Sequence, residues 1–233
     1  MQIKIFFKNI KTILTGSVFE KFLLILFTPA LTRFYTPEFF AIFSLFSSIV
    51  SVFCSLTCLK FENLIVITKE ENKIPEILKT TFFVAIFISL LAYLSLNILY
   101  QVNFEPILKI KEYILIIFLT VLLSNTSQIF NHYFIRYSQF SRFNYIKILN
   151  TSSFILFSII GYYLNFSFNS LIVGYLIGFV FSNIFGIYYV RFKVSKIEIS
   201  NILNQLQKNK DLTVFDSIGS FIHNFSSEIP VFL

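Results

Sequence analysis

Hydrophobic residues gather into six blocks of about 20 residues, the length at which a helix crosses roughly 30 Å of membrane hydrocarbon. The blocks cover residues 13–32, 40–59, 79–100, 113–133, 148–164 and 170–190. After a connection over 191–212, a seventh block runs from 213 to 233. The pattern predicts an all-α membrane protein, with a six-helix transmembrane bundle over 13–190 and a truncated seventh helix.

Lys and Arg alternate between the connections of these blocks. Residues 1–12 and the second-to-third, fourth-to-fifth and sixth-to-seventh connections, with Lys79 at the first position of the third block, hold 15 of the 19 Lys and Arg residues. The other connections hold Arg33, Lys109 and Lys111, and Lys21 lies inside the first block. Because cytoplasmic segments are enriched in Lys and Arg, we expect a multi-pass protein of the inner-membrane type with a cytoplasmic N-terminus.

The composition agrees with a membrane protein and excludes a nucleic-acid partner. Hydrophobic residues make up 56% of the chain and charged residues 13%, against about 45–50% and about 25% in soluble domains. The formal net charge is +7, but the basic residues form neither a dense run nor a patch interleaved with aromatic residues. Membrane lipids are therefore the expected surroundings.

The sequence holds no motif of a catalytic centre. A G-x-S-x-G elbow, a Walker A loop and an H-E-x-x-H helix are all missing, and the connections are short. Cys54 and Cys58 lie on one face inside an apolar block, where packing is their expected role. His132 and His223 have no partner at metal-ligand spacing. We expect no enzyme, no metal site and no cofactor.

Two ionisable residues lie inside the first block. At mid-depth in a membrane such a residue costs at least about 2.5–3.5 kcal/mol, so its presence indicates function. We expect Glu20 and Lys21 to face a polar interior, Glu20 as a candidate for ion coupling and Lys21 as a candidate for substrate binding. The alternative is a helix that begins later, near Phe22.

Small polar residues recur at helical spacing along the second block and just beyond it. The stripe consists of Ser44, Ser48, Ser51, Ser55, Cys58 and Glu62. Such a stripe lines an aqueous cavity or lets another helix approach closely, and close packing is favoured. Glu62, which ends the stripe, is a second candidate for ion coupling.

Glycines in the sixth block also predict close packing. Gly174, Gly178, Ser182 and Gly186 recur at strict four-residue spacing, the small-xxx-small pattern of tight helix contacts.

Further polar side chains lie in the fourth and seventh blocks. Asn125, Gln128 and His132 recur at spacings of three and four and share one helical face. In lipid their donors would lack partners, so the face is expected to point inward as a candidate substrate-binding surface. Asp216 and Glu228 in the seventh block are candidates for ion coupling.

Residues 136–147, between the fourth and fifth blocks, alternate aromatic residues with cations and polar residues. Two interpretations remain open: a segment along the membrane surface, or helix ends with snorkelling cations and interfacial tyrosines.

The first outer turn carries a family resemblance. Residues 31–40 read LTRFYTPEFF and residues 59–62 read LKFE. These segments resemble the Wzx-type O-antigen flippases, the polysaccharide-exporter branch of the multidrug/oligosaccharidyl-lipid/polysaccharide superfamily. In that family a T-R-x-Y-[ST]-P-E-x-[FY]-G turn follows the first helix and an L-R-Y-E element closes the second. The matching residues are Arg33, Tyr35, Pro37, Glu38 and Glu62.

The resemblance implies a transporter of the bacterial cytoplasmic membrane. Its expected substrate is an undecaprenyl-pyrophosphate-linked oligosaccharide, moved by alternating access for O-antigen or capsule biosynthesis. Lys21 and Arg33 become the expected phosphate-facing cations. The chain has about half the length typical of the family, so it is expected to form one lobe of the transporter. The expected partner is either a second lobe or a second copy of the chain in a homodimer.

Three other functions compete with this prediction. A drug or small-solute antiporter of the same superfamily is favoured by a carboxylate buried without nearby cations. A membrane enzyme such as a polysaccharide polymerase requires a large outer loop, which the sequence lacks. A non-transporting membrane subunit is the third.

Overall fold

The computed structural model describes residues 2–55, 60–165, 169–190 and 210–232, with the backbone alone for 2–10, 210–216 and 232. All elements in these ranges are helical, which confirms the predicted fold class. They are α1 (Gln2–Phe34), α2 (Pro37–Ser55), α3 (Phe61–Ile67), η2 (Glu71–Lys73), α4 (Ile74–Gln101), α5 (Glu105–Lys109), η3 (Lys111–Tyr113), α6 (Ile114–Arg136), α7 (Phe140–Tyr163), α8 (Ser170–Tyr189) and α10 (Lys210–Phe232).

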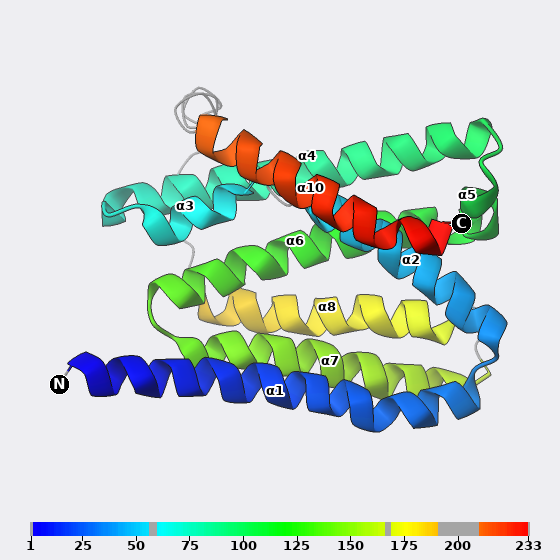
Figure 1. Ribbon diagram of the computed structural model, residues 1–233, viewed down its shortest axis with the longest axis horizontal. Helices are drawn as coiled ribbons and strands as arrows, with labels where there is room; N and C mark the ends of the chain where they lie inside the picture. The colour runs from blue at the N-terminus through cyan, green and yellow to red at the C-terminus, as the bar shows by residue number, and fades with distance from the viewer. Residues whose placement is uncertain (1, 56–59, 166–168, 191–209, 233) are drawn as a thin grey trace.

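Six helical segments in the described part of the chain are long and apolar enough to cross a membrane. They are Lys11–Phe34, Pro37–Ser55, Glu71–Gln101, Lys111–Arg136, Phe140–Tyr163 and Ser170–Tyr189. The predicted six-helix bundle is confirmed, and the chain is a multi-pass membrane protein. The seventh helix, α10, packs along α2 (Figure 1).

The connections between the spanning helices gather at two opposite ends of the bundle (Figure 1). The α3 end holds α3, the start of α1 and the connection between α6 and α7. The α5 end holds α5 and the connections from α1 to α2 and from α7 to α8. The start of α1, the α3–η2 region and the connection between α6 and α7, which are rich in Lys and Arg, all lie at the α3 end, as the charge count predicted. The connection before the seventh helix falls mostly outside the described residues.

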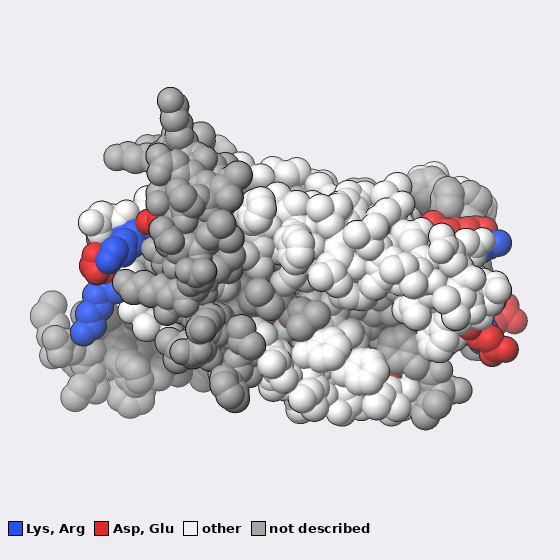
Figure 2. All heavy atoms as spheres, turned by 90° about the horizontal axis from the view of Figure 1, so that it is seen from above, with Lys and Arg blue, Asp and Glu red and all other residues white. Residues whose placement is uncertain are grey.

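Charged side chains are concentrated at the same two ends of the bundle. Figure 2 shows the blue and red side chains of the described residues gathered mainly at the two ends of the long axis, and the described residues between these ends are mostly uncharged. A band of exposed apolar side chains between charged ends is the surface that a lipid bilayer requires.

The first spanning helix begins earlier than the sequence predicted. α1 starts at Gln2 and runs without a break to the outer turn. Lys4, Lys8 and Lys11 lie within this helix and do not interrupt it. The alternative of a helix that begins near Phe22 is wrong.

The fifth spanning helix also begins early. α7 starts at Phe140 and takes in most of the stretch 136–147. The guanidinium carbon of Arg142 lies 4.5 Å from the ring centroid of Tyr189, a cation–π contact between helix ends. Of the two interpretations of this stretch, helix ends that carry cations and tyrosines are confirmed.

The polar stripe predicted for the second helix does not continue to Glu62. α2 ends at Ser55, and Lys60, with a φ of 58°, adopts a left-handed conformation before α3 begins. A regular α-helix cannot pass through such a residue, so Glu62 belongs to a separate short helix. Cys58 lies outside the described residues.

Close packing at the small residues of α8 is confirmed. A Cβ atom on Gly178 would lie 2.6 Å from the backbone oxygen of Asn150 in α7, and one on Gly186 would lie 2.2 Å from the ring of Phe130 in α6. Ser182 Oγ is 3.0 Å from Ser127 Oγ of α6. Glycine and serine therefore let α8 approach both neighbours closely.

Candidate functional site

A cavity of about 520 Å³ lies among α1, α2, α6, α7 and α8. Its volume falls in the usual range for small-molecule sites, about 300–1,000 Å³. Side chains from five helices that are distant in the sequence line it, so the bundle fold itself assembles the site. The cavity brings together several predicted residues and leaves others elsewhere.

Two lysines and one carboxylate line this cavity. Glu20 and Lys21 come from α1 and Lys147 comes from α7. The ammonium group of Lys147 donates a hydrogen bond of 3.4 Å to Ser17 Oγ and lies 4.5 Å from the ring centroid of Phe143. Among the described residues, neither lysine lies within 4.0 Å of a carboxylate oxygen. Both cations are therefore free to bind an anion.

The two lysines lie well inside their helices. Lys21 is ten residues past the start of the spanning segment at Lys11, about 15 Å at 1.5 Å per residue. Lys147 is seven residues past the start of α7, about 10 Å. Neither is at a helix end, where a lysine side chain would reach the membrane surface with little strain.

Amide and hydroxyl side chains form another wall of the cavity. Gln128 and Asn131 come from α6 and Asn150 from α7, together with Ser124 and Ser127. The Oδ1 atom of Asn131 is buried and accepts no hydrogen bond from the described residues. An amide offers both donors and an acceptor, so this wall can bind a polar ligand.

Aromatic rings line the cavity on the side of α2 and α8. The centroids of Phe43 and Phe154 lie 5.7 Å apart in a stacked pair, and Tyr175 packs edge-on against both at 5.8 and 5.9 Å. Phe179 continues this wall at 5.2 Å from Tyr175. Interlocked rings of this kind hold their positions because few rotamers are open to them.

Two residues of the predicted α6 face lie off the cavity wall. Asn125 is fully buried, and neither atom of its amide group has a hydrogen-bond partner in the described part of the chain. The Nδ1 atom of His132 lies 2.9 Å from the backbone oxygen of Gln128 in the preceding turn. Of the three candidates on α6, the cavity takes in Gln128.

The structure places Arg33 away from the cavity. Arg33 lies in the last turn of α1 at the α5 end, with an exposed side chain. Its neighbour Tyr35 is buried and donates a hydrogen bond of 2.6 Å to the backbone oxygen of Ser158 in α7. In the turn that carries the family resemblance, the tyrosine thus anchors the end of α1 to α7.

Glu62 occupies a separate buried position at the α3 end. Its side chain is 2% exposed, and its Oε2 atom has no hydrogen-bond partner among the described residues. Burial raises the pKa of the Glu62 carboxyl to about 7, although the nearby Lys60 ammonium opposes this shift. The Arg136 guanidinium of α6 donates a 2.7 Å hydrogen bond to the backbone oxygen of Ile65 and so fixes α3 in place.

Glu228 joins the seventh helix to the bundle. Ser48 of α2 donates a hydrogen bond of 2.6 Å to Glu228 Oε2. The stripe on α2 therefore meets another helix at Ser48, as the close-packing interpretation predicted. Asp216 belongs to α10, but its side chain lies outside the described residues.

Sequence reasoning missed Lys147 and Asn150. The predicted fifth block began at 148, so Lys147 was counted with the connection. Lys147, Asn150 and Thr151 nevertheless recur at spacings of three and one, which puts them on one face of a helix that begins early. This pattern was the available signal.

The chain matches a known family along nearly its whole length. The model of a family described as polysaccharide biosynthesis protein matches residues 6–233. Searches of curated proteins and of solved structures found no significant match. The match agrees with the resemblance of the first outer turn to polysaccharide exporters. The chain belongs to the polysaccharide biosynthesis protein family.

Proposed function

We propose that this chain translocates a lipid-linked oligosaccharide across the bacterial cytoplasmic membrane, for O-antigen or capsule biosynthesis. The observation that carries the proposal is the cavity lined by Lys21 and Lys147, two cations that have no carboxylate partner among the described residues and lie along apolar helices. The family supports it, because a membrane protein of polysaccharide biosynthesis handles either the glycan or its lipid carrier.

The charges of the cavity suit a pyrophosphate. Lysine is a common phosphate ligand, since its ammonium group offers three donors and a full positive charge. A lysine inside a membrane protein is costly unless an anion or water compensates it. An undecaprenyl-pyrophosphate group supplies that anion between its lipid tail and its sugars.

The remaining walls suit the rest of such a substrate. Gln128, Asn131 and Asn150 offer amide donors and acceptors for sugar hydroxyl groups. The aromatic wall around Tyr175 offers flat apolar surface. A site with few polar groups placed among apolar ones is typical of ligand pockets that fix orientation.

Translocation requires a second wall that moves relative to the first. Transporters built from two structural repeats hold the substrate at the interface between them and open it alternately to each side. We propose that the described bundle is one such lobe. A second lobe or a second copy of this bundle completes the path, with the N-terminus in the cytoplasm.

The test replaces both cavity lysines in cells that depend on this chain for surface polysaccharide. We expect the Lys21→Gln, Lys147→Gln double variant to lower surface polysaccharide at least tenfold, because a hydrogen bond to a charged group contributes about 1.5–3 kcal/mol. The matched control is the Lys69→Gln, Lys109→Gln variant, which removes two exposed lysines. Normal export by the cavity variant at a normal membrane level would refute the proposal.

One observation favours a second candidate, a drug or small-solute antiporter. Glu228 is half-buried against Ser48 and forms no ion pair within the described part of the chain. A protonatable carboxylate in that setting is typical of proton or cation coupling. Deletion of the gene separates the two: loss of surface polysaccharide supports translocation, whereas increased drug sensitivity with normal polysaccharide supports the antiporter.

A further inference from the structure

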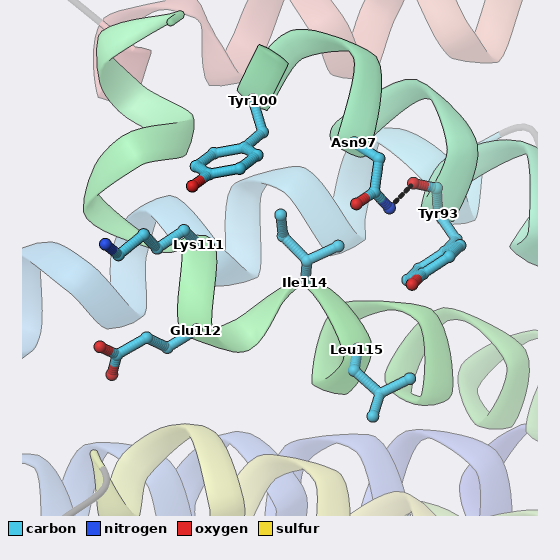
Figure 3. Close-up of a pocket in the computed structure, with 7 residues that line it drawn as sticks. All are labelled: Tyr93, Asn97, Tyr100, Lys111, Glu112, Ile114 and Leu115. Atoms are coloured by element: carbon cyan, nitrogen blue, oxygen red, sulfur yellow. Dashed lines mark hydrogen bonds between the residues drawn. The ribbon is translucent and has the colours of Figure 1, made fainter.

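A second cavity, of about 410 Å³, lies at the α5 end of the bundle. The last turns of α4 form one side, with Tyr93, Asn97 and Tyr100, and η3 forms the other, with Lys111 and Glu112 (Figure 3). This cavity shares no residue with the one that contains Lys21. Its role is therefore a separate question from that of the proposed translocation site.

The cavity presents one positive and one negative side chain next to each other. Lys111 and Glu112 are both exposed, and Figure 3 shows them extending to the same side of η3. No ion pair joins them, since the described residues contain no such contact within 4.0 Å. The whole segment 102–113 has two lysines and two glutamates, so its local net charge is zero.

A free hydrogen-bond acceptor lies in the same cavity. The Nδ2 atom of Asn97 donates a hydrogen bond of 2.7 Å to the backbone oxygen of Tyr93 (Figure 3). This leaves the Oδ1 atom of Asn97 without a partner among the described residues. The ring of Tyr100 lies above Lys111 (Figure 3), and its hydroxyl group both donates and accepts.

Lipid-facing residues surround the cavity. Leu94, Ile98 and Leu115 are 60%, 61% and 59% exposed, as expected for side chains in contact with lipid tails. Tyrosine and charged residues beside such a surface are typical of the level at which lipid headgroups lie. A ligand with an apolar tail and a polar head therefore fits this position.

We propose that this cavity binds the phosphoethanolamine headgroup of a zwitterionic phospholipid. The Lys111 ammonium binds the phosphate, while the carboxylate oxygens of Glu112 accept hydrogen bonds from the primary ammonium of the lipid. A phosphocholine headgroup has no N–H donor for these acceptors. An anionic headgroup lacks a positive group for Glu112 and gains no net attraction from a segment whose charges cancel.

The chain offers a clean fluorescence test because it contains no tryptophan. A Leu115→Trp variant places a reporter at the cavity, and a Leu164→Trp variant places one elsewhere at the α5 end, with 59% and 60% exposure of the natural residues. Each is reconstituted in phosphatidylcholine vesicles with brominated phosphatidylethanolamine, phosphatidylglycerol or phosphatidylcholine as quencher. Quenching reports the lipid bound beside the reporter.

We expect the tryptophan of Leu115→Trp to be quenched about two- to fivefold more strongly by phosphatidylethanolamine than by either other lipid. Contacts between partly exposed charges contribute a preference of this size. Leu164→Trp is expected to show none. In the Leu115→Trp background, Lys111→Gln or Glu112→Gln abolishes the preference, whereas Lys109→Gln and Glu105→Gln, which remove neighbouring charges outside the cavity, keep it.

Three results would overturn the assignment. Equal quenching by all three lipids at Leu115→Trp would show no headgroup site, and preferential quenching by phosphatidylglycerol would show an anion site. Relief of the quenching by millimolar free phosphoethanolamine would assign the cavity to a soluble phosphoamine. The readout does not depend on polysaccharide export, so the proposed function stands or fails separately.

Discussion

Glu62 gives the chain a pH-dependent stability that a single substitution removes. Its carboxyl is buried on α3 without a hydrogen-bond partner for Oε2 in the described residues. Burial raises its pKa from an ordinary value of 4.5 to about 7. The charged group that acts on it is Lys60 at the start of α3, and Arg136 of α6 binds the backbone of the same short helix.

The sign of the effect follows from proton binding. Between pH 4.5 and 7 the folded chain keeps a proton on Glu62 that the unfolded chain has lost, so the free energy of unfolding falls as pH rises. A shift from 4.5 to about 7 corresponds to about 3 kcal/mol at 1.36 kcal/mol per pKa unit. For a chain of this length, that equals a fall in Tm of about 6–12 °C.

Glu62→Gln keeps the shape of the neutral side chain and removes the titration. We expect this variant and the unmodified chain to melt at similar temperatures near pH 4.5, and the variant to melt about 6–12 °C higher at pH 8. The assay is thermal unfolding in detergent micelles, followed by circular dichroism. Glu71→Gln, at an exposed position of η2, is the matched control.

If the melting temperatures of the Glu62→Gln variant and of the unmodified chain differed by the same amount at every pH from 4.5 to 8, the reasoning would be refuted. All other titratable groups are common to both proteins, so the difference between the two curves isolates Glu62 to a first approximation.

Three further predictions follow from the packing and topology. Gly178→Val drives a side chain into the backbone of α7 and should destabilise the chain by about 1–3 kcal/mol, whereas Gly219→Ala, which meets open space inside α10, should not lower the melting temperature, since alanine favours a helix over glycine. Tyr35→Phe removes the hydrogen bond to α7 and should lower Tm by about 2–4 °C, equivalent to about 1 kcal/mol; an unchanged Tm would contradict that anchor. Reporter fusions at Gln139 and Gln101 should report the cytoplasm and the outside, and a reversal at either would contradict the proposed orientation.

The helices and their order were predictable because a spanning helix needs one property, an apolar length. Lipid leaves no choice of backbone hydrogen bonding, so each apolar block becomes a helix. The spacing of small residues on α8 also predicted its helix contacts, because small residues at every fourth position of a membrane helix let a neighbouring helix approach closely. Boundaries were harder, since Lys147 is polar and still belongs to α7.

The cavity was only partly predictable because it depends on which helix faces meet. Lys21 was recognised from its depth in an apolar block, and Gln128 from its spacing with Asn125 and His132 on one helical face. Lys147 was not, and Arg33 was expected nearby but lies at the α5 end. Lys60 separates α3 from α2 by its left-handed backbone. This conformation does not change the spacing of the hydrophobic residues, so the sequence pattern does not reveal it. Such features follow from tertiary packing, which a single sequence does not display.

Photo-crosslinking inside the cavity tests the central claim most directly. A benzophenone amino acid replaces Phe43, which lines the cavity, or Phe83, which is 50% exposed toward lipid, and the chain is irradiated with radiolabelled undecaprenyl-pyrophosphate oligosaccharide. We predict labelling at position 43 well above position 83, and its loss when Lys21 and Lys147 are both replaced by glutamine. Equal labelling at the two positions, or labelling that survives the loss of both lysines, would contradict the account.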